Sequence, residues 1–367
     1  MGKYDIAAYV WPAYTGDEPR TRMFWPEGIG EWQTVKNSAP KENGYFWNRK
    51  PLWGYVNEAD PYVMSGQIEA AVSHGVNVFI YDWYWYDDRP FLENCLNDGF
   101  LKAPNNGKMK FYLMWANHDA GTLWDKRIAG RVETNIWQGT VSRQQFENIG
   151  KRWIEKYFKR DNYYRIDGKP VISIYDISNL IKGLGGIRET ADAMKWLEEE
   201  AKREGLGGVH FQFIRWDGSI ANCSGVDGSA IENESELIEA LGFHSVTNYQ
   251  FVHMTNMNRD YTEAVEDVKK LWDTIEEEYT VPYYPHVSVG WDNNPRLYDF
   301  VDNISVNNTP ENFKVCLQHV KEYCDKRDIR LITVNSWNEW TETSYLEPDD
   351  LYGYGYLEAI RDVFKDE

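Results

Sequence analysis

The sequence of 367 residues predicts an α/β fold, a (β/α)8 TIM barrel with elaborated loops at the carboxyl ends of its strands. Eight short apolar runs alternate with helical patterns along the chain. The runs are almost continuously apolar, which is typical of parallel strands buried on both faces. No linker, low-complexity stretch or long run of like charges divides the chain, so we expect a single domain over residues 1–367.

Each predicted strand is rich in β-branched and aromatic residues. In chain order the strands are Tyr4–Val10, Val76–Tyr81, Lys108–Trp115, Pro170–Tyr175, Gly208–Ile214, Ser245–Phe251, Tyr284–Val289 and Arg330–Asn335. Segments with apolar residues at helical spacing lie between them. These predicted helices are Pro61–His74, Ser142–Phe158, Arg188–Glu204, Ser235–Leu241, Thr262–Tyr279, Thr309–Lys326 and Leu357–Phe364.

A doubly wound open sheet is the competing architecture, but it would usually bring a glycine-rich turn after the first strand. The first strand here ends in Tyr9-Val10-Trp11-Pro12, which cannot cradle a pyrophosphate. The histidines are scattered without the spacing of a zinc site, so we expect neither a cofactor nor a metal. Roughly 50 residues then pass without a clear helix until Pro61, and loops of that length are usually functional.

Composition disfavours several classes of partner. The formal net charge of −19 speaks against nucleic acid, because phosphate binding depends on clustered Lys and Arg. No apolar stretch approaches the roughly 18 residues that indicate a membrane span. Aromatic residues make up 16% of the chain, and their faces suit the C–H faces of sugars, so we expect an oligo- or polysaccharide substrate. The chain enters a strand without a signal peptide, which predicts a cytoplasmic protein if the chain is complete and a periplasmic or secreted one if a leader was removed.

The carboxyl ends of the predicted strands carry polar and aromatic residues, and catalytic groups of such barrels lie at these ends. Most ends pair an aromatic ring with a carboxylate or an amide, which matches the apolar faces and hydroxyls of a sugar. A single Trp-Asp pair can equally belong to a loop that caps its own helix. The expected substrate-binding residues are Tyr9, Trp11, Asp82, Trp83, Tyr84, Trp115, Asn117, Asp176, Tyr249, Trp291, Asp292, Arg296, Trp337 and Asn338.

The eighth strand is followed by two glutamates, Glu339 and Glu342, three residues apart. They share a face if the backbone turns helically there and diverge if it stays extended. Two neighbouring carboxyls can divide the work of glycoside hydrolysis, one protonated and one ionised, and Trp337 and Trp340 could supply the apolar wall that raises one pKa. A solvated acidic loop is the alternative. Carboxylates turned into bulk solvent, or buried as partners of arginines, would contradict a catalytic pair.

Two further groups of residues receive structural interpretations. The four cysteines do not make a disulfide framework, and we expect buried free thiols at Cys95, Cys223, Cys316 and Cys324. A second acidic group follows the glutamate pair, but its spacing fits no calcium loop. We expect this group, Glu347, Asp349 and Asp350, on a solvated face.

The segment Asn338-Glu339-Trp340-Thr341-Glu342, continuing to Leu346-Glu347-Pro348, resembles a signature of glycoside hydrolase family 99, the endo-α-mannosidases and endo-α-mannanases. The sequence is more similar to the family 99-like group called WbsX-like, whose members are often labelled glycosyltransferases. The similarity spans nearly the whole chain. Supporting segments are Tyr9-x-Trp11-Pro12, Asp82-Trp83-Tyr84, Trp115-Ala116-Asn117, Asp167 to Val171, Gly290 to Arg296 and Pro348 to Glu358.

The resemblance implies a catalytic (β/α)8 barrel that retains anomeric configuration. One Glu acts as a base on the substrate 2-hydroxyl, which attacks the anomeric carbon and gives a 1,2-anhydro sugar, while the other Glu protonates the leaving oxygen and then activates water. Carried over by position, Glu339 assists the 2-hydroxyl and Glu342 is the acid/base. Thr341 stands where the mannosidases have His, so mannose specificity does not follow. Thr343 stands where both groups have Gly, at a position where the backbone shape could require Gly.

Two other functions remain open at this point. The first is a glycosyltransferase of polysaccharide biosynthesis, although the sequence has no Asp-x-Asp at a strand end for a metal-bound nucleotide sugar. The second is a non-catalytic carbohydrate-binding barrel. A retaining glycoside hydrolase acting on an α-linked glycan is the leading hypothesis.

Overall fold

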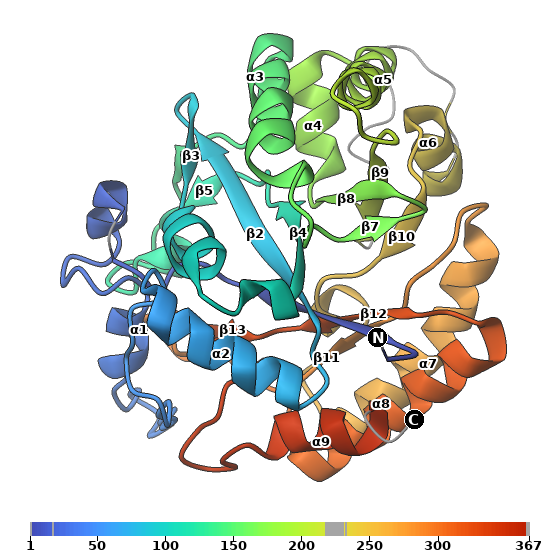
Figure 1. The fold of residues 1–367 in the computed structure, drawn as a ribbon. Coiled ribbons are helices and arrows are strands. Elements are labelled where there is room, and N and C mark those ends of the chain that lie inside the picture. The colour runs from blue at the N-terminus through green and yellow to red at the C-terminus, as the bar shows by residue number, and fades with distance from the viewer. Residues whose placement is uncertain (1, 17, 217–230, 232, 365–367) are drawn as a thin grey trace.

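The structure is a computed structural model that describes residues 2–16, 18–216, 231 and 233–364. Eight parallel strands form a nearly closed barrel with helices outside it, which confirms the predicted fold (Figure 1). Around the barrel the strands follow the order β10-β9-β8-β4-β2-β1-β12-β11. Their bounds are β1 (Asp5–Val10), β2 (Val78–Tyr86), β4 (Lys110–Trp115), β8 (Lys169–Ile174), β9 (His210–Ile214), β10 (Ser245–Thr247), β11 (His286–Ser288) and β12 (Leu331–Asn335).

The barrel closes between β10 and the segment before β11. Val246 forms an isolated parallel bridge with Tyr283, through hydrogen bonds from Val246 N to Pro282 O (2.9 Å) and from Tyr284 N to Val246 O (2.8 Å). On the opposite side β1 lies between β12 and β2, with Ala7 paired to both Thr333 and Val78. This closure brings the carboxyl ends of all eight strands to one mouth.

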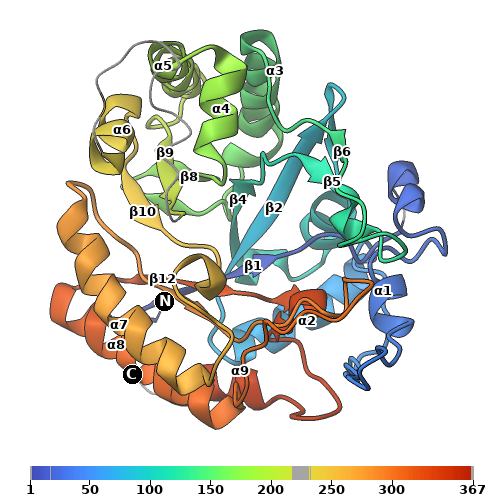
Figure 2. The ribbon, with the colours of Figure 1, turned by 180° about the vertical axis from the view of Figure 1, so that it is seen from behind.

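The helices begin where the sequence offers capping residues. Asp60, Ser142, Asn233 and Thr309 each accept a backbone N–H bond at a helix start. Helices α7, α8 and α9 pack side by side along one flank of the barrel (Figures 1 and 2). The helices are α1 (Trp32–Lys36), α2 (Pro61–Ser73), α3 (Arg143–Trp153), α4 (Ile177–Leu184), α5 (Ile187–Arg203), α6 (Glu234–Leu241), α7 (Tyr261–Glu278), α8 (Pro310–Arg327) and α9 (Gly355–Phe364).

The second strand extends beyond its predicted end at Tyr81. It runs to Tyr86 and then turns back into β3 (Arg89–Phe91) as an antiparallel hairpin. The two turn residues, Asp87 and Asp88, both have positive φ angles, 52° and 59°, which matches the tight turn that joins hairpin strands. Because side chains alternate along an extended strand, neighbouring residues of β2 face opposite sides of the barrel wall.

The long segment after β1 contains more structure than the sequence indicates. It holds a 3-10 turn, η1 (Pro19–Met23), and the short helix α1, and its tryptophans Trp25, Trp32 and Trp47 are buried in the core. These rings therefore pack the loop against the barrel rather than offering free stacking surfaces. None of the helices in the described ranges is both long and apolar enough to span a lipid bilayer.

Minor strands complete the fold. They are the pair β5 (Ala120–Gly121) and β6 (Asn135–Trp137), the short strand β7 (Arg165–Ile166) beside β8, and the pair β13 (Asn338–Glu339) and β14 (Ser344–Tyr345). Cys95, Cys316 and Cys324 are buried free thiols, as expected. Cys223 lies outside the described residues.

Candidate active site

The two glutamates after β12 lie on one face of a tight turn. Glu339 ends β13, and the 3-10 helix η9 (Trp340–Glu342) follows directly. The turn brings the two side chains to one buried guanidinium, so they converge as the helical alternative of the sequence prediction expected. The Glu339 backbone N–H donates to Ser336 Oγ (2.7 Å), which fixes the start of the turn.

A buried arginine joins the two carboxylates. Arg296 donates through one terminal nitrogen to Glu342 Oε1 (2.9 Å) and through the other to Glu339 Oε2 (3.2 Å). Its Nε also donates to Glu31 Oε1 (3.1 Å). The arginine is 4% exposed, so these are contacts in a dry environment.

Burial of the two glutamates as partners of an arginine was expected to contradict a catalytic pair. Whether it does depends on the balance of charges in the cluster. One guanidinium faces three carboxyl groups, so the cluster keeps excess negative charge when all three are ionised. A structural ion pair would balance its charges. The excess favours retention of a proton within the cluster, which a general acid requires.

The pKa values of both glutamates are raised. Burial is the largest cause for Glu339, whose pKa lies well above the usual range, and repulsion from Glu342 adds to it more than Arg296 subtracts. Burial also raises the pKa of Glu342, while Arg296 opposes the shift. Because the two groups interact strongly, their protons are lost in steps that belong to the pair.

A third carboxyl, Asp82 of β2, is linked to the pair by a phenol. Tyr249 places its hydroxyl 3.0 Å from Asp82 Oδ2 and 3.3 Å from Glu339 Oε1. One phenol hydrogen can be donated to only one of them. Asp82 is buried, burial raises its pKa well above the usual range, and its other oxygen, Oδ1, has no partner. Asp82 therefore offers a free acceptor at the carboxylate cluster.

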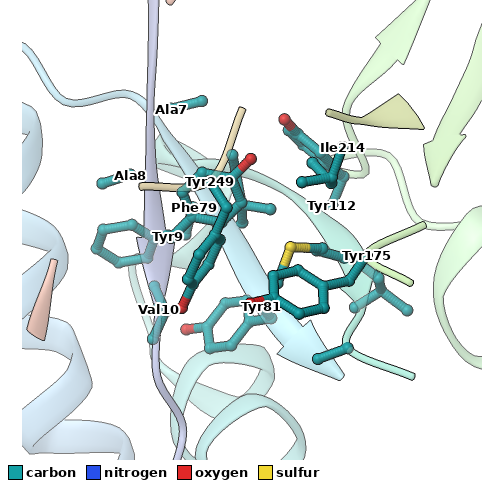
Figure 3. Close-up of a cluster of buried hydrophobic side chains, with 14 of the residues drawn as sticks. Ala7, Ala8, Tyr9, Val10, Phe79, Tyr81, Tyr112, Tyr175, Ile214 and Tyr249 are labelled. Carbon is teal, nitrogen blue, oxygen red and sulfur yellow. The ribbon is translucent and has the colours of Figure 1, made fainter. Parts of the chain in front are cut away.

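Aromatic rings enclose this cluster. The ring of Tyr249 lies 4.8 Å from that of Tyr9 and 5.2 Å from that of Tyr175, and Figure 3 shows these three residues gathered in the barrel interior. On the other side Trp11 donates its indole N–H to Glu31 Oε2 (2.6 Å) and meets the ring of Tyr84 edge-on at 5.7 Å. The apolar surroundings are the physical cause of the burial effect on the glutamates.

Three predicted tryptophans lie elsewhere, and for them the sequence prediction was wrong. They point to the outer side of the barrel wall, where their neighbours are helices and other core rings. Trp83 packs on Trp153 of α3, Trp115 packs on Trp153 and Phe146 of α3, and Trp337 donates to Gln67 of α2. The expected wall of Trp337 and Trp340 around the glutamates therefore comes from Trp11, Tyr84 and Tyr249 instead.

The other predicted residues have positioning or capping contacts. The side-chain amide of Asn117 donates to Asp176 O (2.6 Å) and accepts from Asp176 N (2.8 Å), and the Asp176 carboxylate caps α4 by accepting from Asn179 N (2.9 Å). Asp292 accepts from the hydroxyl of Tyr45, and its backbone N–H donates to Glu342 O (2.8 Å). Trp291 is half-buried, and its indole N–H is buried without a partner.

Asn338 stands next to Glu339 and fixes the turn to β1. Its side-chain oxygen accepts from Trp11 N (2.8 Å), and its amide donates to Trp11 O (2.9 Å). The same amide donates to both carboxylate oxygens of Glu58, at 3.2 and 3.0 Å. Asn338 is therefore a positioning residue.

Sequence reasoning missed Glu31, the third carboxyl on Arg296. It lies in the long segment after β1, where Gly30 has a φ of +60° and an added Cβ would stand 1.8 Å from the carbonyl oxygen of Ala13. Only glycine permits this close approach, and the Glu31 N–H then bonds to the same carbonyl (3.0 Å). The Gly-Ile-Gly-Glu run was the available signal for a constrained loop.

Sequence reasoning also missed an aromatic group beside Tyr249. Trp216 stacks on His253 with ring centroids 4.0 Å apart, and Trp216 meets Tyr175 edge-on at 4.7 Å. Burial lowers the pKa of His253 to about 4, so this ring is neutral at physiological pH, and its Nδ1 has no partner. The His253 ring lies 6.3 Å from the ring of Tyr249, so this stack borders the carboxylate cluster.

The second acidic group is buried, contrary to prediction. Glu347 and Asp349 are 2% and 1% exposed, and only Asp350 reaches solvent. Asp349 accepts from Tyr345 and from two backbone N–H groups, which satisfies its charge. Among the residues that the structure describes, no group of three His, Cys, Asp or Glu side chains is arranged to hold a metal ion.

The model of a family described as glycosyltransferase WbsX matches residues 6–360. Two uncharacterized proteins called WxcX, from two strains of Xanthomonas campestris pv. campestris, are each 26% identical over 353 residues. The match covers 94% of this chain and 47% of theirs, so the chain spans about half the length of these relatives.

Among solved structures, the endo-α-mannosidase of glycoside hydrolase family 99 from Bacteroides thetaiotaomicron superposes with a TM-score of 0.62 at 15% identity, covering 99% of this chain and 96% of that one. A glycoside hydrolase-like protein gives 0.60 at 14% identity, covering 99% and 94%. At such identities the likeness shows the fold, which is a glycoside hydrolase-like barrel.

Proposed function

The chain belongs to the glycosyltransferase WbsX family, and from the geometry of its site we propose that it is a retaining glycoside hydrolase acting on an α-linked glycan. One observation carries the proposal. Glu339 and Glu342 share one face of a turn at the carboxyl end of β12, and the single guanidinium between them serves a third carboxyl as well. Such a cluster can hold one proton and one charge at the same time, which is what acid and base catalysis need.

The contacts and the exposure of the two carboxyls support a division of roles within the pair. A proton on Glu342 removes the largest charge repulsion acting on Glu339, and Arg296 and Tyr249 then stabilise the Glu339 anion. Glu342 is also the more accessible of the two, because its side chain is 13% exposed and that of Glu339 is 5% exposed. An acid needs this access, since it must reach the leaving oxygen and later a water molecule. We therefore assign Glu339 as the base and Glu342 as the acid.

The proposed reaction has two balanced steps. Glu339 accepts the proton of the substrate 2-hydroxyl, whose oxygen attacks the anomeric carbon, while Glu342 gives its proton to the departing glycosidic oxygen. Water then opens the 1,2-anhydro sugar, with its proton going to the Glu342 carboxylate, and Glu339 returns a proton to the 2-oxygen. Two inversions at the anomeric carbon give overall retention.

The polar groups around the pair suit a hydroxylated ring. Asp82 Oδ1 and His253 Nδ1 are buried and lack partners, so each can bind a sugar hydroxyl. The structural neighbour from Bacteroides thetaiotaomicron acts as an endo-α-mannosidase, which supports an α-linked substrate. The carboxylate of Asp82 is also placed to accept from a hydroxyl near Glu339.

The test is release of reducing sugar from a panel of α-mannans and bacterial polysaccharides. We expect the wild-type chain to cleave at least one of them, and we expect Glu339→Gln and Glu342→Gln each to lower kcat/KM by about 10²- to 10⁴-fold. Glu93→Gln is the matched control, because Glu93 is equally buried and accepts a tryptophan N–H, but contacts neither glutamate. Full activity in both site variants would refute the assignment.

The family description names a different activity, and the same protein preparation tests it. Thermal shifts with UDP- and GDP-sugars report binding of an activated donor. Stabilisation by a nucleotide sugar, without hydrolysis of any glycan in the panel, would replace the hydrolase proposal with a transferase. Sugar-induced change in tryptophan fluorescence without turnover of anything tested would indicate a binding protein.

A further inference from the structure

A second pair of buried carboxyls lies behind the candidate active site. We propose that Glu58 and Glu347 form a proton-sharing pair that positions Glu339, by holding the residue before it and the residue after it. This inference rests on the proposed function, in which Glu339 is the base. Neither residue contacts Arg296 in the structure, so the pair is separate from the Arg296 cluster.

Glu347 holds the residue that follows Glu339. Trp340 donates its indole N–H to Glu347 Oε2 at 2.6 Å, and both side chains are buried. The Trp340 ring is also stacked on Tyr345 of β14 at a centroid distance of 3.9 Å. Trp340 begins the turn η9, so its orientation sets the direction in which the chain leaves Glu339.

Glu58 holds the residue that precedes Glu339. Its two oxygens accept from the Asn338 amide at 3.2 and 3.0 Å, and that amide is fixed to the backbone of Trp11. Glu58 itself is held in place where Gly99 approaches it, since a Cβ on Gly99 would stand 2.0 Å from Glu58 O. The position of Glu339 is therefore defined on both sides by carboxyls that do not touch the reacting atoms.

One amide links the two carboxyls. Gln67 of α2 donates from Nε2 to Glu347 Oε1 (2.8 Å) and to Glu58 Oε1 (3.1 Å), and its oxygen accepts from Trp337 (3.2 Å). The Oε1 atoms of Glu58 and Glu347 both accept from this one nitrogen, so the two carboxyls lie side by side, and a shared proton relieves the repulsion between them because two carboxylates offer only acceptors.

The surroundings favour a single shared proton. Within the described part of the chain, no Lys, Arg or His hydrogen-bonds to either carboxyl, and the titratable groups that face the pair are Cys95, Tyr81 and Tyr14, all neutral at physiological pH. Burial raises the pKa of Glu58 to about 7 and raises the pKa of Glu347 well above its usual range. Glu58 accepts from Asn338, Gln67 and the Cys95 thiol, and Glu347 accepts from Trp340 and Gln67.

Because Asn338 and Trp340 flank Glu339, the Glu58–Glu347 pair affects the position of a reacting group and not only the packing of the core. A displacement of about 1 Å at a reacting group can cost about 10²-fold in rate, and residues that orient catalytic ligands typically change activity by about 10- to 100-fold. We expect the pair to act on kcat rather than on substrate affinity, because neither carboxyl reaches the substrate side of Glu339.

The test compares graded variants with a control elsewhere in the barrel. Glu347→Gln keeps an oxygen for Trp340 but loses the shared proton, and Glu347→Leu loses both. With a polysaccharide that the wild type cleaves, we expect kcat to fall about 10-fold in the first and about 100-fold in the second, with KM within twofold. Glu93 is a comparable buried acceptor of a tryptophan N–H; Glu93→Gln keeps an oxygen for Trp83 and Glu93→Leu removes it, and we expect thermal destabilisation without a change in kcat.

Crystal structures of the same variants answer the question without a substrate. We expect the Glu339 carboxylate to move in Glu347→Leu and to stay in place in Glu93→Leu. Unchanged kcat and an unmoved Glu339 in both Glu347 variants would overturn the inference, as would equal losses of kcat in the Glu93 series. If the wild type cleaves no glycan, the proposed function fails, and the position of Glu339 in the crystals still decides whether the pair positions it.

Discussion

Two arginines of this barrel, Arg152 and Arg296, contact carboxylates in opposite ways. On the outer side of the wall, Arg152 binds a single carboxylate, Glu93, through two nitrogens, and Trp83 and Tyr157 donate to the same group at 2.7 and 2.9 Å. Burial pushes the pKa of Glu93 upward, but the arginine outweighs it and the pKa is lowered. This carboxylate is permanently ionised at neutral pH and is structural.

At the mouth of the barrel, Arg296 is divided among three carboxyls. Each receives only part of the guanidinium, and the pKa values of Glu339 and Glu342 are raised, first by burial. The number of carboxyls per arginine, and not the presence of an arginine, therefore separates a structural pair from a site that can donate and accept protons. An arginine contact alone does not exclude catalysis.

Removing Arg296 should have the largest effect. In Arg296→Gln the cation that lowers both glutamate pKa values is absent, so both pH limits of kcat/KM should move to higher pH, and activity at neutral pH should fall by about 10²- to 10⁴-fold. Arg152→Gln, the matched change on the outer wall, should leave the pH profile in place. If Arg296→Gln kept the wild-type pH dependence of kcat/KM, Arg296 would not set the pKa values of the two glutamates.

Removing Arg152 should instead cost stability. Glu93 would remain buried without its cation, and breaking such a pair typically costs about 3–5 kcal/mol, reduced here to about 2–4 kcal/mol because Arg152 is 25% exposed. Urea unfolding of Arg152→Gln against the wild type measures the loss. Unchanged stability would mean that Glu93 becomes protonated at little cost in free energy. The Arg152–Glu93 pair and the Arg296 cluster would then differ less in their electrostatics than their geometry indicates.

The pH dependence of stability should have opposite signs in the two regions. The raised pKa of Glu339 means that the folded state holds this proton longer than the unfolded state, so its contribution is present at low pH and is lost as pH rises through the folded pKa. The lowered pKa of Glu93 gives a contribution that is present above the usual glutamate pKa and lost as pH falls. Each group changes the slope by up to about 1.4 kcal/mol per pH unit.

Unfolding free energies of Glu339→Gln and Glu93→Gln across a pH series test these signs. Glu339→Gln should flatten the curve on the alkaline side, and Glu93→Gln should flatten it on the acid side. Two variants with the same pH dependence would contradict the comparison.

The sequence predicted the barrel and the glutamate pair because both depend on local patterns. Continuous apolar runs identify buried parallel strands, and the three-residue spacing of Glu339 and Glu342 needed only a helical turn to place them together. Asp82, Tyr249 and Arg296 were also predicted from their places near strand ends, and the structure brings them together beside Glu339.

The errors have equally physical causes. Trp83 was assigned to the site because β2 was expected to end at Tyr81, whereas the strand continues and alternation turns Trp83 outward. Glu31 and the Glu58–Glu347 pair depend on tertiary contacts between distant segments, such as Gln67 reaching Glu347 across 280 residues. Glu347 was expected at the surface because it is polar. A single sequence does not reveal the hydrogen-bond partners that offset the cost of burying it.

The smallest expected effect concerns Thr343, directly after Glu342, the proposed acid. Its φ of 55° places a β-branched residue in the left-handed region, at a cost of roughly 1–2 kcal/mol. Its hydroxyl accepts from Trp47 Nε1 (2.8 Å) and donates to Asp292 O (3.0 Å), and two such bonds contribute a similar amount. Thr343→Gly loses both bonds and the strain, so its unfolding free energy should stay within about 1 kcal/mol of the wild type. Thr343→Ala loses the bonds and keeps the strain, so it should be less stable than Thr343→Gly by roughly 1 kcal/mol, and the reverse order would show that the turn does not impose this backbone shape.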